Sequence, residues 1–258
     1  MTEPLPRQLA ALRRAAPPTL LPAVLAATGT GDLYCEIEGP IGPVYVAFNR
    51  HGVSMIELAG AGADFESGFT RRLGRPAHRT DTVPAALEDP LRRALAEGRP
   101  GRLPIDLRRV TPFQAGVLRK TAEIPRGEVR PYSWLATEVG RPGAHRAAAT
   151  AVARNPVPLI VPCHRVVRLD GQLGGYSLGS VSNKRRLLEA EGVDVEGLTR
   201  LASRGIRLVG SATGRVYCHP TCRHARRIEP SHRVEFRTAA EAEGEGRRPC
   251  SHCRPRGA

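Results

Sequence analysis

Residues 154–166 read RNPVPLIVPCHRV, an apolar run in which a cysteine lies between a proline and a histidine. This pattern supplies the parts of an activated thiolate, because His164 can take the proton of Cys163 and a neighbouring cation can stabilise the anion. The alternative is a buried cysteine beside a surface histidine. The residues PCHR alone leave both interpretations open, so the surrounding sequence has to separate them.

Helical segments flank this run on both sides. Residues 132–139 and 143–154 predict two short helices joined by Gly-Arg-Pro. Many DNA-binding proteins use such a helix-turn-helix to lay the second helix along a groove, although any pair of packed helices gives a similar pattern. Beyond the cysteine, a glycine-rich turn at 170–175 precedes a predicted helix over 183–191.

The amino-terminal part of the chain has a different pattern. Residues 1–30 contain a short amphipathic stretch at 8–15 among several prolines, which predicts a loosely packed lead-in. Alternating apolar residues over 33–58 predict a β-hairpin or small antiparallel sheet, with the lone Cys35 buried in a strand. A helix is predicted over 85–97.

The composition makes a polyanionic partner such as nucleic acid one of two candidates. The chain has 258 residues, long enough for two domains, and a formal net charge of +14. Lys120 and Lys184 are its only lysines, so its cations are almost all arginines, which bind phosphate with two parallel hydrogen bonds. Composition alone favours a nucleic acid and a generally basic surface about equally. The sequence has neither a membrane-spanning run nor a secretory pattern, which predicts a cytoplasmic, nucleoid-associated protein that contacts no membrane.

The segments around the cysteine resemble a known family in order and spacing. The matching segments are TPFQ at 111–114, IPRGEV at 124–129, PYSWLA at 131–136, HRAAA at 145–149, PCHRV at 162–166, GGYS at 174–177 and KRRLLEAEG at 184–192. Residues 33–192 thereby resemble O6-alkylguanine-DNA alkyltransferases. The resemblance implies stoichiometric transfer of methyl or alkyl groups from O6-alkylguanine in DNA, with O4-alkylthymine as a second candidate lesion, and no organic cofactor.

The resemblance assigns chemical roles by position. It implies that Cys163 is the alkyl acceptor, that His164 deprotonates it through a water, and that Glu191 orients the histidine. Asn155 matches the residue that braces the active-site loop, and Tyr132 matches the tyrosine that gives a proton to the departing guanine.

A second set of positions matches residues that contact DNA or the base. Arg146 matches the arginine inserted into the duplex in place of the flipped nucleotide, and Tyr176 and Ser177 match residues of the base pocket. Arg165 is predicted to contact DNA with them. The alternatives are a solvated arginine at Arg146 and ordinary core packing at Tyr176. The chain departs from the family pattern at Leu178, where glycine is usual and a leucine could narrow the pocket.

The carboxy-terminal cysteines have the spacing of a zinc site. Cys218-x3-Cys222 and Cys250-x2-Cys253 supply two chelating pairs, which predicts a tetrahedral structural zinc. Residues 211–258 are expected to be too short for a hydrophobic core of their own, so the metal would supply folding free energy. Nearby histidines could substitute as ligands, but four cysteines already complete the shell; these histidines are His219, His224, His232 and His252.

This tail resembles the metal-binding domain of the Ada repair protein. The matching segments are YCHPTC at 217–222, FRTAAEAE at 236–243 and RRPCSHCRP at 247–255. The resemblance implies that Cys218 is a candidate second acceptor, taking methyl groups from DNA phosphotriesters. A purely structural or DNA-gripping zinc domain is the favoured alternative, because the strand before Cys218 is short and TGRVYC has one residue more before the cysteine than the usual pattern. The domain order is reversed relative to Ada and no activator segment lies between the domains, which argues against Ada's transcriptional role.

The expected fold class is α+β. A small antiparallel, ribonuclease-H-like sheet subdomain (31–108) follows the lead-in, and a helix-turn-helix alkyltransferase domain (109–192), a linker (193–210) and a four-cysteine zinc domain (211–258) complete the chain. The expected partner is double-stranded DNA containing alkylated guanine, bound by a monomer. Two rival functions are a non-catalytic lesion sensor or transcriptional regulator, disfavoured by Cys163 beside His164, and a Cys-His hydrolase, disfavoured by the DNA-binding features.

Overall fold

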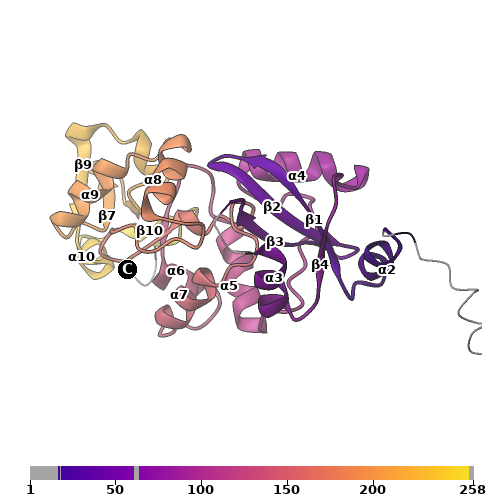
Figure 1. Cartoon of the computed structure of the whole chain (residues 1–258). Helices are drawn as coiled ribbons and strands as arrows, with labels where there is room; N and C mark the ends of the chain where they lie inside the picture. Colours follow the sequence, from indigo (N-terminus) through magenta and orange to yellow (C-terminus); the bar gives the residue numbers. More distant parts are fainter. Residues whose placement is uncertain (1–16, 18, 61–63, 256–258) are drawn as a thin grey trace, which may run out of the picture.

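A computed structural model describes residues 17, 19–60 and 64–255 (Figure 1). Its amino-terminal part is a sheet in the order β3-β2-β1-β4. The strands are β1 (Asp32–Gly39), β2 (Gly42–Asn49), β3 (Gly52–Leu58) and β4 (Ala77–Arg79). The first three pair antiparallel, as predicted, whereas β4 pairs parallel to β1, so the sheet is mixed. The sequence patterns did not predict β4 because it has only three residues.

Two helices cover opposite faces of this sheet, and Figure 1 shows them above and below the strands. Helix α4 (Ala85–Glu97) has the bounds predicted and packs Leu91 against Val44 and Val46 of β2. Helix α3 (Phe65–Leu73) packs Phe69 against the face that carries Ala47. Because successive side chains of β2 point to opposite faces of the sheet, this strand contributes to two separate apolar clusters.

The lead-in, predicted to be loosely packed, contains one described helix, α2 (Leu20–Thr28). Its Leu20 and Leu21 are 50% and 60% exposed, which agrees with loose packing. The amphipathic stretch predicted at 8–15 lies outside the described residues.

The second part is helical and carries the active-site motif. Its elements are α5 (Pro112–Ala122), β5 (Arg130–Pro131), α6 (Tyr132–Glu138), α7 (His145–Ala153), the short 3-10 helix η1 (Cys163–Arg165), β6 (Val166–Val167) and α8 (Val181–Ala190). The predicted helix-turn-helix is α6 and α7, joined by a turn in which Gly140 adopts φ +73°, a conformation that favours glycine. Helix α8 begins two residues before the predicted start because the side chain of Ser180 accepts the backbone hydrogen bond of Asn183.

The segment expected to be a linker is folded. Residues 193–210 contain α9 (Val195–Ser203), capped by Asp194, and most of β7 (Leu208–Ser211). The other elements of the tail are β8 (Val216–Cys218), the 3-10 helices η2 (Ala225–Arg227) and η3 (Pro230–His232), β9 (Arg233–Phe236), α10 (Ala239–Gly244) and β10 (Arg248–Pro249).

The tail has a small hydrophobic core, contrary to expectation. Its strands form a sheet in the order β10-β8-β7-β9. Leu208, Tyr217 and Phe236 are at most 1% exposed and pack with Ala242. The expectation failed because β7 starts before the predicted domain boundary and brings Leu208 into this cluster. In the described part of the chain, every helix is too short or too polar to cross a membrane.

Candidate active site and metal centre

Cys163 begins η1 and lines a pocket of about 520 Å³ between α6, α7 and the glycine-rich loop. The pocket also receives Tyr132, Tyr176 and Ser177. The thiol is almost fully buried, 3% exposed, and its sulfur lies 3.5 Å from the Ser177 hydroxyl oxygen. Burial raises the pKa of the Cys163 thiol, so the thiol is protonated at rest and requires a base before it can attack.

Asn155 holds the loop that leads to the cysteine. Its side-chain amide donates to the carbonyl of Val161 at 2.8 Å, and its side-chain oxygen accepts from the backbone of Val157 at 3.0 Å. Between them, the buried Leu159 adopts φ +71°, a left-handed conformation that is rare for leucine. Such strain persists only where the surroundings impose it, and the two Asn155 bonds are part of those surroundings.

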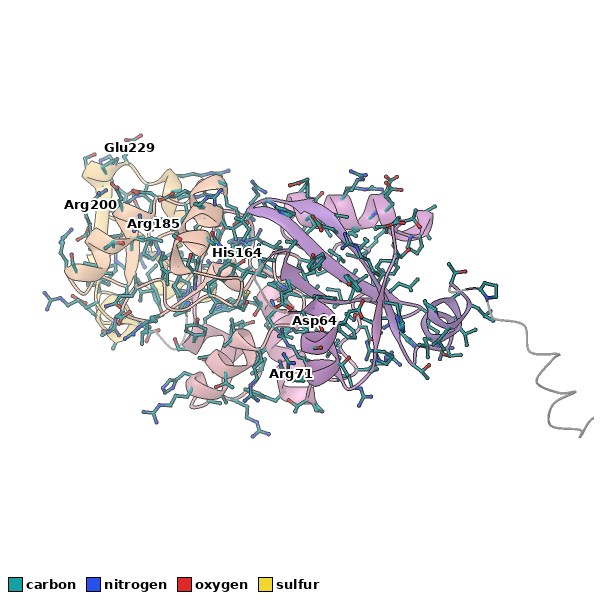
Figure 2. The ribbon with its side chains drawn as sticks, viewed as in Figure 1. Asp64, Arg71, His164, Arg185, Arg200 and Glu229 are labelled. Carbon is teal, nitrogen blue, oxygen red and sulfur yellow. The ribbon has the colours of Figure 1, made fainter. Side chains whose placement is uncertain are left out.

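His164 forms a buried pair with Glu191, which lies just after α8. The Nε2 of His164 is 2.9 Å from Oε1 of Glu191, and the histidine, labelled near the middle of the view in Figure 2, is 1% exposed. Burial opposes ionisation of Glu191, but hydrogen bonds from His164 and Arg165 outweigh it and lower its pKa to about 2. Burial also lowers the pKa of His164. The resting pair is therefore a neutral imidazole and a carboxylate.

The state of this pair fixes the histidine tautomer. A carboxylate only accepts hydrogen bonds, so Nε2 of His164 must carry the proton and Nδ1 must keep its lone pair. The Nδ1 atom is buried and has no hydrogen-bond partner among the described residues. It is thus available to accept a proton from a water or thiol.

Arg165 does not reach the surface, contrary to the prediction that it contacts DNA. Its side chain is 1% exposed and donates to both oxygens of Glu191, at 2.8 and 2.7 Å, and to the carbonyls of Ile124 and Glu97. Gly98 leaves room for it, because a Cβ there would lie 2.4 Å from the guanidinium. Arg165 therefore anchors Glu191 and is buried too deeply to touch a phosphate.

The structure shows how Tyr176 and Leu178 lie relative to the pocket. Tyr176 is half-buried and packs against both the sheet cluster and the helical cluster, and its hydroxyl has no partner among the described residues. Leu178 is 3% exposed and packs in the sheet cluster rather than lining the pocket. Leu178 therefore does not narrow the base pocket, contrary to the expectation from the sequence.

Lys184 is a site residue that the sequence patterns did not single out. It is fully buried on α8, and its ammonium donates to the carbonyls of Val166 and Leu173 at 2.5 Å each and of Gly175 at 3.4 Å. These carbonyls belong to β6 and to the loop over the pocket. Burial lowers the pKa of Lys184 to about 8. The sequence offered two signals: Lys184 is one of only two lysines in the chain, and it begins the matching segment KRRLLEAEG.

Arg146 lies apart from these buried groups. It is exposed on the first turn of α7, the second helix of the helix-turn-helix. Ala149 and Val152 of the same helix line the pocket with Cys163. One face of α7 therefore borders the pocket while Arg146 projects into solvent, as a residue that enters a duplex would have to do.

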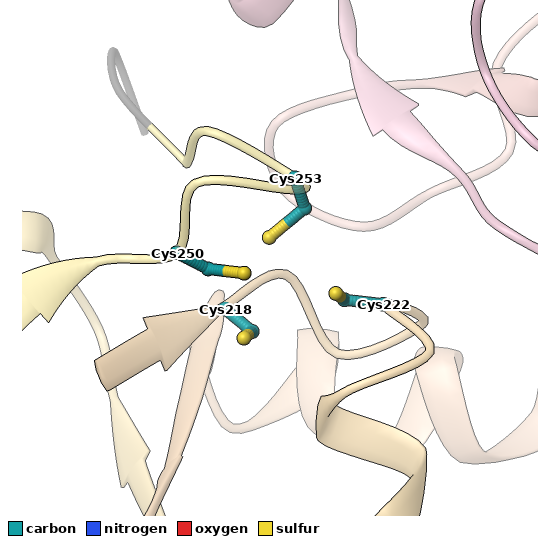
Figure 3. A group of neighbouring side chains, drawn as sticks. All are labelled: Cys218, Cys222, Cys250 and Cys253. Atoms are coloured by element: carbon teal, nitrogen blue, oxygen red, sulfur yellow. The ribbon is translucent and has the colours of Figure 1, made fainter. Parts of the chain in front are cut away.

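The four tail cysteines converge from β8, the loop after it and the turn after β10 (Figure 3). All are buried, and their sulfur atoms lie within 4.8 Å of one another. A tetrahedral zinc with Zn–S bonds of about 2.3 Å needs sulfurs roughly 3.8 Å apart, so this donor set fits the ion. The backbone N–H of His219 donates to the sulfur of Cys253 at 3.4 Å. His252 is paired with Glu128 instead, at 3.0 Å.

Comparison with known proteins decides the family. Residues 112–193 match the family model of the 6-O-methylguanine DNA methyltransferase DNA-binding domain. The methylated-DNA–protein-cysteine methyltransferase of Methanosarcina barkeri is 37% identical over 162 residues, which span 61% of this chain and 96% of that protein. This chain belongs to the methylated-DNA–protein-cysteine methyltransferase family. The family resemblance inferred from the motifs and the α+β fold are thereby confirmed.

Further similarities support the family, and one of them covers the carboxy-terminal tail. The Mycobacterium tuberculosis O6-methylguanine methyltransferase structure is 33% identical, with a TM-score of 0.50, covering 62% of this chain and 92% of that one. The methyltransferase of Methanothermobacter thermautotrophicus is 50% identical, but the match spans only 51% of its length. Residues 202–256 match the metal-binding domain of Ada. The Escherichia coli bifunctional transcriptional activator/DNA repair enzyme Ada is 36% identical over 63% of this chain and 46% of its own length.

Proposed function

We propose that this methyltransferase reverses alkylation damage by moving an alkyl group from O6 of guanine in duplex DNA to the sulfur of Cys163. The observation that carries the proposal is the buried thiol of Cys163 in a pocket beside a neutral His164 whose Nε2 is held by Glu191. O4-alkylthymine is a second candidate substrate, because it also presents an alkylated oxygen on a base.

The first step is removal of the thiol proton. A water in the pocket carries it from Cys163 to Nδ1 of His164, the atom left with a free lone pair. The imidazolium that forms lies against the carboxylate of Glu191, which stabilises the positive charge. Arg165 keeps that carboxylate ionised and fixed.

The second step is displacement at the alkyl carbon. The thiolate sulfur forms a bond to this carbon while the carbon–O6 bond breaks and its electron pair passes to the guanine. Tyr132 lines the same pocket, and burial raises the pKa of its hydroxyl, so the hydroxyl is present in its protonated form. It can donate its proton to the departing base and recover one from the imidazolium. The products are guanine and a thioether, with no organic cofactor needed.

The lesion reaches the pocket only if the nucleotide rotates out of the duplex, at a cost of a few kcal/mol. Exposed Arg146 at the start of α7 is placed to fill the vacated space, and Tyr176 and Ser177 to contact the base. The net charge of +14 favours association with DNA phosphates. We propose that the protein acts as a monomer at the nucleoid.

The decisive experiment is intact-protein mass spectrometry with peptide mapping after incubation with duplex DNA carrying O6-methylguanine. A stoichiometric gain of one methylene unit on the peptide containing Cys163 supports the transfer. Cys163→Ala should lose it while still binding duplex DNA. Binding of lesion DNA without any mass gain in the natural protein would instead support a lesion sensor or regulator, and turnover of a carboxylic ester would support a hydrolase.

For the tail we propose a zinc domain that stabilises the fold and grips DNA through its arginines. The matched Ada model and the convergence of four buried sulfurs support the metal. Cys218 is the candidate acceptor for methyl groups from DNA phosphotriesters, and the same mass spectrometry with phosphotriester DNA separates the two roles. A gain on the Cys218 peptide supports repair, and its absence with bound zinc supports the structural role alone.

A further inference from the structure

The zinc domain docks on the segment that carries Tyr132. Glu128, 1% exposed, is the centre of the contact. One oxygen of its carboxylate pairs with Arg130, and the other accepts from the backbone of Arg223 at 3.1 Å and contacts Nε2 of His252 at 3.0 Å. A buried carboxylate with this many partners resists displacement, because each separated partner would lose a charged hydrogen bond.

Two further contacts extend the docking along the chain. The hydroxyl of Thr221 accepts from the backbone N–H of Val129 at 2.9 Å and lies 3.4 Å from the carbonyl of the same residue. Arg254 pairs with Glu138 at 2.9 Å. Its guanidinium lies 5.7 Å from the ring centroid of Trp134.

Each docking residue of the tail is a direct sequence neighbour of a clustered cysteine. Thr221 and Arg223 flank Cys222, and His252 and Arg254 flank Cys253. The backbone positions of these residues therefore depend on the four sulfurs being drawn together by a metal.

On the other side, the docked segment leads directly into the transfer site. Arg130 and Pro131 form β5, which pairs with β6 immediately after the η1 turn that holds Cys163. The next residue is Tyr132, in the pocket. Trp134 follows and packs in the same apolar cluster as Cys163.

We propose that the metal-bound cysteine cluster is a positioning device for alkyl transfer in the same chain: by holding residues 128–134, it sets Tyr132 against Cys163. This role rests on the proposed function and is distinct from phosphotriester repair. Thr221, Glu128 and Arg254 are its positioning residues.

Matched variants of the full-length, zinc-loaded protein test the proposal. Thr221→Val keeps the shape of the side chain but removes the hydroxyl, whereas Thr221→Ser keeps the hydroxyl. Arg254→Ala removes the second contact, and Arg237→Ala removes the same charge from an exposed zinc-domain position. Zinc content, DNA affinity, the single-turnover transfer rate at saturating O6-methylguanine duplex, and Trp134 fluorescence are measured for each. Trp134 is the only tryptophan, so the tryptophan emission comes entirely from the ring that Arg254 and Arg130 border.

We expect Thr221→Val and Arg254→Ala to slow transfer about three- to tenfold, the usual effect of a lost hydrogen bond, with zinc content and DNA affinity unchanged. Their Trp134 emission should shift, and Thr221→Ser and Arg237→Ala should behave as the natural protein. Natural transfer rates in both test variants would overturn the proposal. If the natural protein transfers no alkyl group, the proposed function fails. The docking of the zinc domain is tested separately by chelating the zinc, and unchanged Trp134 emission after chelation would overturn the docking proposal.

Discussion

Nε2 of His164 lies 2.9 Å from Oε1 of Glu191, a residue that Arg165 also holds through two hydrogen bonds. His164, the proposed catalytic base, and the residue after it thus share one buried carboxylate. Glu191 sets the tautomer of His164, and Arg165 keeps Glu191 charged.

Glu191→Gln should slow alkyl transfer by about a hundredfold or more, because a neutral amide neither stabilises the imidazolium nor enforces the tautomer. Single-turnover assays with O6-methylguanine duplex measure the effect. Glu189→Gln is the matched control, since Glu189 lies near the end of α8, two residues before Glu191, and its ion pair in the described structure is with Arg185, whose side chain is 43% exposed. Equal rates in both variants would remove Glu191 from the mechanism.

Acid stability should depend on Glu191. Its pKa is about 2 in the folded protein and 4.5 in its ordinary state, so its contribution is fully present above pH 4.5 and is lost as the pH falls towards 2. The shift corresponds to about 3 kcal/mol of unfolding free energy. Denaturant unfolding across this range should show a shallower acid loss in Glu191→Gln than in the natural protein. If the unfolding free energies of the two proteins changed with pH in parallel, the assignment of an ionised Glu191 paired with His164 would be contradicted.

Lys184→Met should loosen the loop over the pocket, because the buried carbonyl of Val166 and the partly buried carbonyls of Leu173 and Gly175 lose their donor. We expect destabilisation by about 2–4 kcal/mol. Since the pKa of Lys184 falls from 10.5 to about 8, its burial penalty is complete below pH 8 and is relieved as the pH rises towards 10.5. The natural protein should therefore gain stability over Lys184→Met across that window in urea titrations. A constant difference would show that Lys184 does not titrate there.

Arg146→Ala should reduce transfer from duplex DNA by about tenfold or more, because an empty gap in the base stack favours return of the flipped nucleotide. Arg92→Ala is the control. It removes the same charge from α4, the helix that covers the sheet, where the Arg92 side chain is 74% exposed, and it should retain activity. Stopped-flow fluorescence with a reporter base beside the lesion follows flipping directly. Matching flipping traces for the two variants would exclude an intercalating role.

Cys250→Ser should abolish stoichiometric zinc binding and lower the melting temperature of the tail, because zinc contributes about 10–16 kcal/mol to the folding of such small domains. Cys35→Ser is the control, since Cys35 is equally buried but lies in β1 outside the cluster. Metal analysis and calorimetry give both quantities. Full zinc content in Cys250→Ser would show that the remaining cysteines or a histidine complete the shell.

Local sequence was enough to find the chemistry-bearing residues. PCHRV located the proposed nucleophile, the cysteine spacings located the cluster proposed to bind zinc, and the ordered motifs identified the family. These features are local, so a short stretch of chain contains the whole signal. The helices over 85–97 and 132–154 were predictable for the same reason, since their periodicity and turn residues lie within the elements.

Only the folded chain shows which way several of these residues point. Arg165 is next to the nucleophile in sequence but faces Glu191 and the interior, and Leu178 follows the pocket residues but packs against the sheet. The carbonyls bound by Lys184 and the docking of Thr221 on Val129 join segments far apart in the chain. Burial and hydrogen-bond partners are set by packing between distant segments, and no local pattern carries that information.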